Sequence, residues 1–239
     1  MSGGLFHLPS DLQNSYAGLI GLHLREALLP VLGGLVVALP VAQLCVRLRW
    51  LYAPVLWVTT VLYAIPSLAF FVVLIDYTGQ TETTVMIPLA VYSLVVLVPA
   101  IVDAVRSVPQ ETLAAATAMG FGPVRRYVQV QLPIAVPAIL AGLRVATVSS
   151  ISLVSVGALI GNQGALGNLL HDGMVYHQPR LVWLSVIGTA VLAVLADAVL
   201  VAVRLLLTPW MPRGTRRARP VDAEARPEPA AAALEDAVR

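Results

Sequence analysis

Long apolar runs separated by short polar links make up most of this chain. A helix needs about 20 apolar residues to cross a bilayer, and five runs reach that length. They lie at residues 27–46, 52–75, 85–105, 134–160 and 181–207. The runs are continuous and do not alternate with a period of two, which excludes a membrane-spanning β-barrel. The pattern therefore predicts an all-α membrane protein with five transmembrane helices.

The composition agrees with this prediction. Of the 239 residues, 58% are hydrophobic and 12% are charged, whereas a soluble domain carries about 25% charged residues. The surplus of apolar side chains has to face lipid. The single cysteine, Cys45, can form neither an intrachain disulfide nor a metal site alone. No basic segment followed by an apolar core opens the chain, so we expect no cleavable signal peptide. Residues 23–26 (HLRE) are expected to form a turn at the membrane interface.

Arginine is concentrated in the links that would share one side of the membrane. The arginines after the first, third and fifth runs are Arg47, Arg49, Arg106, Arg125, Arg126, Arg213, Arg216, Arg217 and Arg219. The opposite side has only Arg180 near the end of a run and an acidic link at 76–84. The positive-inside rule places the arginine-rich side in the cytoplasm. We therefore expect an extracytoplasmic segment at 1–18, a transmembrane domain at 19–208 and a cytoplasmic, disordered tail at 209–239.

The link at 106–133 is too polar, and too often broken by Gly and Pro, to cross a membrane. Ser107 and Pro109 predict a capped helix start. Gly120 predicts the end of that helix, because glycine tolerates the left-handed closing turn. A second helix is expected at 124–132, ended by the proline that follows.

The first of these two helices suits contact with another protein. Its alanines keep the surface low, so that a partner can approach closely, and apolar side chains are expected to project from it. The alanines are Ala114, Ala115, Ala116 and Ala118, and the apolar side chains are Leu113, Met119 and Phe121. A partly apolar helix held on one side of a membrane predicts a docking element. An ordinary loop helix is the alternative.

The same link carries a motif with fixed spacing. Its positions are Ala114, Ala115, Ala116, Gly120, Val130, Leu132 and Pro133. This spacing resembles the EAA signature of the permeases of bacterial ATP-binding-cassette (ABC) importers. The signature usually begins with Glu, so Ala114 is a departure, and the nearest acid is Glu111, about one helical turn earlier.

The resemblance implies that 106–133 is a coupling loop that inserts into a groove on a cytoplasmic ABC ATPase subunit. The residues expected to take part are Leu113, Ala114, Ala115, Ala116, Met119, Gly120, Phe121, Leu132 and Pro133. The chain has no G-x-x-x-x-G-K-[ST] phosphate loop, so we expect a transport subunit rather than an enzyme, with no cofactor of its own and with ATP and Mg²⁺ on the ATPase. The other expected partners are a second permease subunit, an extracytoplasmic substrate-binding protein and membrane lipid, with no nucleic acid.

A narrower resemblance covers roughly residues 20–207. The matching stretches are 63–74, 132–144 and 157–170. They are similar to permeases for glycine betaine, carnitine and choline, although Asn162 and Gln163 depart from the usual glycine-rich turn. The resemblance implies import of a quaternary ammonium compatible solute, such as these three or proline betaine, across the bacterial cytoplasmic membrane. Methionine-type importers share the five-span plan, so methionine or another small solute stays open. An ATP-independent secondary transporter or channel is the alternative of another class.

Polar or helix-breaking residues inside the predicted spans are candidates for a translocation pathway or gate. They are Pro66, Ser67, Arg144, Ser149, Ser152 and Asp197. A plain kink at Pro66 and helix contacts at the serines are the structural alternatives. An arginine inside a span faces protein or water, so Arg144 is expected to pair with Asp103 or a backbone carbonyl unless it forms a gate. Asp197 is expected to pair with Arg204. No aromatic cage for a quaternary ammonium is evident, so we expect selectivity in the binding protein.

Overall fold

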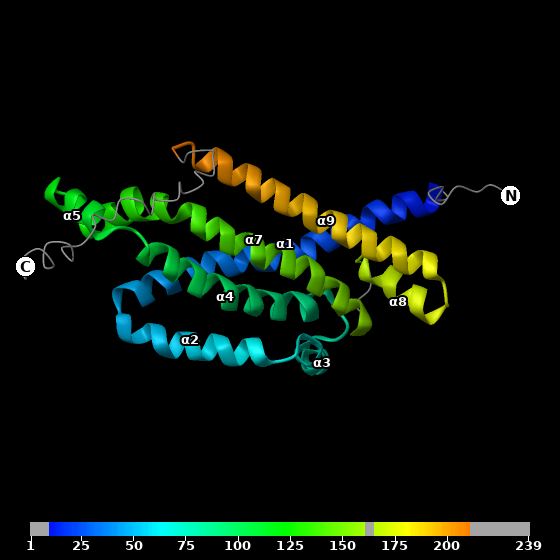
Figure 1. The fold of residues 1–239 in the computed structure, drawn as a ribbon. Coiled ribbons are helices and arrows are strands. Elements are labelled where there is room, and N and C mark those ends of the chain that lie inside the picture. Colours follow the sequence, from blue (N-terminus) through cyan, green and yellow to red (C-terminus); the bar gives the residue numbers. More distant parts are fainter. Residues whose placement is uncertain (1–9, 161–164, 211–239) are drawn as a thin grey trace, which may run out of the picture. The chain divides into compact units, whose positions relative to one another are not determined.

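The computed structural model describes residues 10–160 and 165–210, and all secondary structure in these ranges is helical (Figure 1). The all-α prediction is therefore confirmed for the described part of the chain. The helices belong to one unit that ends at Thr208. The predicted disordered tail lies almost entirely outside the described residues, as do Asn162 and Gln163.

Four described segments are long and apolar enough to cross a membrane. They are Tyr16–Arg47 within α1 (Ser10–Arg47), Glu82–Arg106 (α4), Pro123–Ile160, which includes α7 (Leu132–Gly157), and Pro179–Leu207 (α9). A further candidate is the pair α2 (Arg49–Ala64) and α3 (Ser67–Thr78), which are bent by 88° relative to each other. This part of the chain therefore has four candidate spans, or five if the bent pair is one span.

The apolar run at 52–75 is not one helix, because the chain changes direction at Pro66. Proline has no N–H to continue the helical ladder, and the carbonyl of Leu62 accepts a bond from the N–H of Ile65 instead, at 3.3 Å. The hydroxyl of Tyr92 on α4 donates to the carbonyl of Ile65 at 2.8 Å. The expected kink is thus a complete break, and a side chain from another helix fixes it.

The expected interfacial turn at 23–26 is wrong, because α1 continues through it without interruption. His23 and Glu26 are fully buried. The Nε2 atom of His23 lies 2.9 Å from the carbonyl oxygen of Ile151 on α7. These polar side chains are covered by helix packing and do not lie at a water interface.

Hydroxyl groups from neighbouring helices approach backbone carbonyls of α1 near Pro30, whose nitrogen cannot donate to the carbonyl of Glu26 four residues earlier. The Ser150 hydroxyl donates to the carbonyl of Ala27 at 2.8 Å. The Ser93 hydroxyl lies within hydrogen-bond distance of the carbonyl of Pro30, at 3.3 Å. These contacts connect α1 to α7 and α4 close to the proline.

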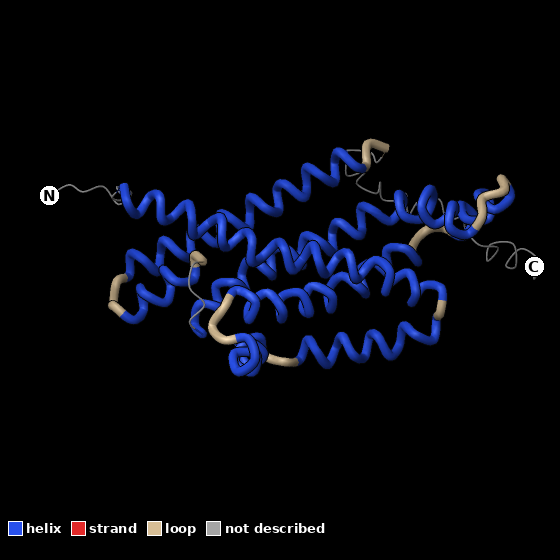
Figure 2. The backbone as a smooth tube through the Cα atoms, turned by 180° about the vertical axis from the view of Figure 1, so that it is seen from behind, coloured by secondary structure: helices blue, strands red, loops and turns tan. Residues whose placement is uncertain are grey.

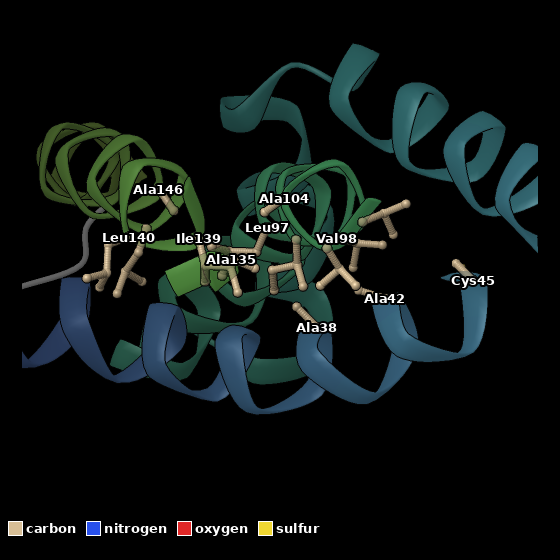
Figure 3. Close-up of a cluster of buried hydrophobic side chains, with 14 of the residues drawn as sticks. Ala38, Ala42, Cys45, Leu97, Val98, Ala104, Ala135, Ile139, Leu140 and Ala146 are labelled. Atoms are coloured by element: carbon tan, nitrogen blue, oxygen red, sulfur yellow. The ribbon is translucent and has the colours of Figure 1, made fainter. Parts of the chain in front are cut away.

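The core between α1, α4 and α7 is rich in small residues (Figure 3). The buried alanines of this cluster are Ala38, Ala42, Ala104, Ala135 and Ala146. Gly34 lies so close to Ser93 that a Cβ atom would clash, and a Cβ atom at Gly142 would also be too close to Ala100. In lipid, helices associate through close packing of this kind.

A short helix, α8 (Gly167–Val175), occupies part of the link between the fourth and fifth apolar runs, which is rich in glycine. A Cβ atom at Gly173 would clash with Val182 on α9, so glycine permits this contact. The Ser185 hydroxyl donates to the carbonyl of Leu166 at 2.7 Å and fastens the start of α8 to α9. Figure 2 shows that the described loops are short and join the ends of helices.

Candidate functional site

The predicted docking helix is present as α5 (Gln110–Ala118). It begins after Pro109, and no side chain caps its first turn. Ser107 donates its hydroxyl to the carbonyl of Ala104 at 2.8 Å, so it closes α4 and the predicted serine cap is wrong. Gly120 follows the helix with a φ of 81°, which is the predicted left-handed closing turn.

The open face of α5 is made of alanines. Ala114 and Ala115 are exposed, and Met119, just after the helix, is 70% exposed. Leu113 and Ala116 are buried, and Leu113 belongs to the core shared by α1, α4 and α7. The expectation that Leu113 projects toward a partner is therefore wrong, because its side chain fastens α5 to the membrane helices.

The second predicted helix does not end at Pro133. Residues Pro123–Arg126 form α6, and Tyr127–Gln131 form a π-helical segment that runs directly into α7. A proline ring clashes with the carbonyl four residues earlier, and a wide π turn just before Pro133 provides room for it. The link is thus continuous with the membrane helix, and Leu132 and Pro133 are half-buried there.

Two arginines brace the loop internally. Nη1 of Arg126 donates to Oγ1 of Thr117 on α5 at 2.8 Å. The guanidinium of Arg125 lies 4.3 Å from the ring centre of Phe121, and its Nε donates to Oε1 of Gln129 at 2.9 Å. Phe121 is therefore engaged within the loop, and the arginines hold α5 and α6 in a defined relation.

A third arginine ties the α1–α2 link to the end of α4 that leads into α5. Arg106 lies 4.5 Å from the ring centre of Tyr52 and donates to the carbonyl of Cys45 at 3.2 Å. The hydroxyl of Tyr52 donates to Asp103 at 3.4 Å. Asp103 thus faces Tyr52, and it is not the partner of Arg144.

A cavity of about 620 Å³ lies where α2 and α3 meet, against α4 and α7. Its lining includes four of the six pathway candidates. They are Pro66, Ser67, Ser149 and Ser152. No charged side chain lines this cavity in the described part of the chain. Two tyrosines that the sequence analysis did not select, Tyr63 and Tyr92, also line it. The only signal for Tyr63 is its position one turn before Pro66, at the end of a helix.

The remaining two pathway candidates pair with each other. The Nε and Nη2 atoms of Arg144 on α7 donate to the two carboxylate oxygens of Asp197 on α9, at 2.6 and 2.7 Å. The expected pairs of Arg144 with Asp103 and of Asp197 with Arg204 are therefore wrong. Neither side chain lines the cavity, so the pair joins two helices instead.

A family comparison identifies the class of protein. Residues 24–213 match the family described as "Binding-protein-dependent transport system inner membrane component". The chain belongs to this family. The match covers the coupling-loop candidate, the cavity and the candidate spans, except for the first turns of Tyr16–Arg47, so this permease is a transport component of the inner membrane.

Several curated relatives of this permease are named for osmoprotectant transport. The osmoprotectant import permease protein OsmW of Salmonella typhimurium is 31% identical over 85% of this chain and 96% of its own length. The glycine betaine/carnitine/choline transport system permease protein OpuCD of Bacillus subtilis is 31% identical over 78% of this chain and 82% of its length. The choline transport system permease protein OpuBB of the same organism is 26% identical over 78% and 86%.

Solved structures show the same fold. The permease matches a chain of the MetNI methionine ABC transporter in an inward-facing conformation with a TM-score of 0.75, at 18% identity, over 84% of this chain and all of the other. An amino acid ABC transporter matches with a TM-score of 0.60 at 17% identity, over 86% of this chain and all of the other. The membrane fold is therefore that of ABC transporter permeases.

Proposed function

We propose that this chain is the permease subunit of an ATP-driven importer of a quaternary ammonium compatible solute, such as glycine betaine, carnitine, choline or proline betaine. The observation that carries the proposal is the similarity to an osmoprotectant import permease over almost that protein's entire length. The uncharged cavity agrees with it, because a path without carboxylates would not retain a solute that has a fixed positive charge.

The coupling loop is the proposed contact with a cytoplasmic ATPase, which would bind ATP and Mg²⁺. Ala114, Ala115 and Met119 supply the open surface, while the arginine braces and buried Leu113 hold that surface against the membrane helices. Motion of the ATPase would then reach α4 and α7 directly, because the loop is continuous with both helices. The distribution of arginine supports a cytoplasmic location for this end of the bundle, with the N-terminus outside.

The proposed pathway runs along the face that carries the cavity. Ser149 and Ser152 are exposed there, and no hydrogen bond of their hydroxyls is formed within the described residues. Hydroxyls left unpaired against lipid are unfavourable. This face is therefore better suited to water, or to a second permease subunit, than to lipid. An extracytoplasmic binding protein would deliver the solute.

Other solutes remain competing proposals. The methionine transporter is similar in fold only, at 18% identity. The ergothioneine transport permease/binding protein EgtU of Helicobacter pylori is 34% identical, but over 59% of this chain. An ATP-independent transporter is disfavoured by membership of a binding-protein-dependent family.

Competition for uptake tests the solute. Vesicles that contain the permease, its ATPase and its binding protein, supplied with ATP, are expected to accumulate labelled glycine betaine. Excess choline or carnitine should reduce the initial rate, whereas excess methionine should not. Failure to accumulate any quaternary ammonium solute, or competition by methionine, would contradict the proposal.

A further inference from the structure

We infer that the cavity at the α2–α3 break holds the quaternary ammonium group of the solute in transit, between the carbonyl end of α2 and the ring of Tyr63. The inference rests on the proposed function, which supplies a solute with a fixed positive charge. It adds a recognition site in the permease itself, where the sequence led us to expect recognition by the binding protein alone.

The first observation is that carbonyls at the C-terminal end of α2 have no N–H donor within the described chain. In an unbroken helix, the carbonyls of Tyr63 and Ala64 would accept bonds from the N–H groups of Ser67 and Leu68. Those residues begin α3 and turn away by 88°, and within the described chain no other N–H takes their place. A helix C-terminus carries partial negative charge, and the last turn of α2 has no basic residue. Both Tyr63 and Ala64 line the cavity, so this carbonyl end borders it. Ser67, at the uncapped start of α3, lines it too, so the partial charges of the two helix ends offset each other and the carbonyl oxygens act as local contacts.

The second observation is that the two cavity tyrosines differ in whether their rings are free to contact a ligand. Tyr92 is buried, its hydroxyl is bonded to Ile65, and its ring meets Phe70 edge to face with centroids 6.0 Å apart. Tyr92 is therefore a positioning residue for the break. Tyr63 is 66% exposed, so its ring is available to a ligand. A cation over an aromatic face is stabilised by the ring quadrupole.

Carbonyl oxygens and an aromatic ring are both groups that a quaternary ammonium group can contact. Its methyl groups donate no strong hydrogen bonds, so recognition depends on contact with partly negative oxygens and with the face of an aromatic ring. Because no carboxylate lines the described cavity, binding would be weak. A transit site needs an affinity high enough to admit the solute and low enough to release it.

Protection of a cysteine in the cavity tests this site. Cys45 is the only cysteine of the chain and is buried, so Cys45→Ala gives a thiol-free background for Ser149→Cys. In the assembled transporter, choline is expected to slow maleimide labelling of the new thiol. Its neutral carbon isostere, 3,3-dimethylbutan-1-ol, should not. Tyr63→Leu should raise the half-protecting choline concentration about three- to tenfold, whereas Tyr63→Phe should leave it unchanged.

The controls distinguish failure of this site from failure of the proposed function. Equal protection by the neutral alcohol, or an unchanged half-protecting concentration in Tyr63→Leu, would overturn the inference. If Tyr63→Leu does not assemble, Tyr63→Trp replaces it. The half-protecting choline concentration should then fall, because Trp is the stronger cation–π partner. A rise or no change in that concentration would overturn the site. Glycine betaine uptake by the unmodified transporter is measured in parallel. Normal uptake without charge-dependent protection rejects the site alone, whereas absent uptake rejects the proposed function as well.

Discussion

Charged side chains within the bundle are held by partners on other helices. Arg144 and Asp197 form a two-point ion pair between α7 and α9. A charge inside a span is costly unless it meets protein or water, and removing one member of such a pair leaves the other uncompensated. The pair therefore holds α9 against α7 in a single register.

Exchanging the two charges tests this role. Arg144→Leu and Asp197→Leu should each lower the thermal midpoint of the purified permease by several degrees, because each leaves one charge unpaired. The exchanged double variant, Arg144→Asp with Asp197→Arg, should recover a substantial part of that loss. Single variants as stable as the unmodified protein would show that the pair does not contribute to stability.

The sequence was enough to select candidate polar residues, but it did not show which side chains they contact. Arg144, Asp197 and the serines stand out because they are polar on an apolar background. The partner of Arg144 depends on which faces of α7 and α9 meet, and spacing along the chain does not contain that information. Tyr63 has only a weak signal in sequence, its position one turn before Pro66, because tyrosine is common near the ends of membrane helices.

Among the elements, the turn after α5 depends most directly on the backbone conformation of its glycines. Gly120 has a φ of 81° and Gly122 a φ of −65°. No neighbouring atom would contact a Cβ at either position. The two glycines therefore differ in backbone conformation but not in the room available for a side chain, which makes Gly122 a matched control.

Alanine substitutions at these glycines test whether the shape of the turn matters for coupling. The left-handed conformation costs a non-glycine residue about 1–2 kcal/mol, which corresponds to roughly five- to thirtyfold fewer molecules with the correct turn. Gly120→Ala should therefore weaken binding of the ATPase and reduce solute-stimulated ATP hydrolysis severalfold. Gly122→Ala should leave both unchanged. Equal effects of the two substitutions would exclude the left-handed turn as the cause.

The long helices α4, α7 and α9 could be predicted closely, because apolar length and positive charge at the ends are local signals. The position of the break at Pro66 could be predicted but its angle of 88° could not, since contacts from another helix, such as the bond from Tyr92, are not visible in the local sequence. Helix α8 was missed, because its glycines suggest a loop and only packing against α9 makes them favourable. The continuity of the loop with α7 was missed because Pro133 suggests a helix end.

At the scale of the whole transmembrane unit, two helices link the proposed sites. Helix α4 contributes Tyr92 to the cavity and leads into α5, and α7 contributes Ser149 and is continuous with α6. Movement of the loop by an ATPase would therefore shift two walls of the cavity relative to the α2–α3 break. This arrangement would let ATP hydrolysis on the proposed ATPase partner move a solute.

The most direct measurement is the nucleotide dependence of uptake by the assembled transporter. Vesicles that contain the permease, its ATPase and its binding protein should accumulate labelled glycine betaine with ATP and not with a non-hydrolysable analogue. The matched transporter with Gly120→Asp, which adds a negative charge beside the proposed docking surface, should assemble in the membrane yet show strongly reduced ATP-driven uptake. Uptake that continues with the non-hydrolysable analogue, or that survives Gly120→Asp unchanged, would contradict the account.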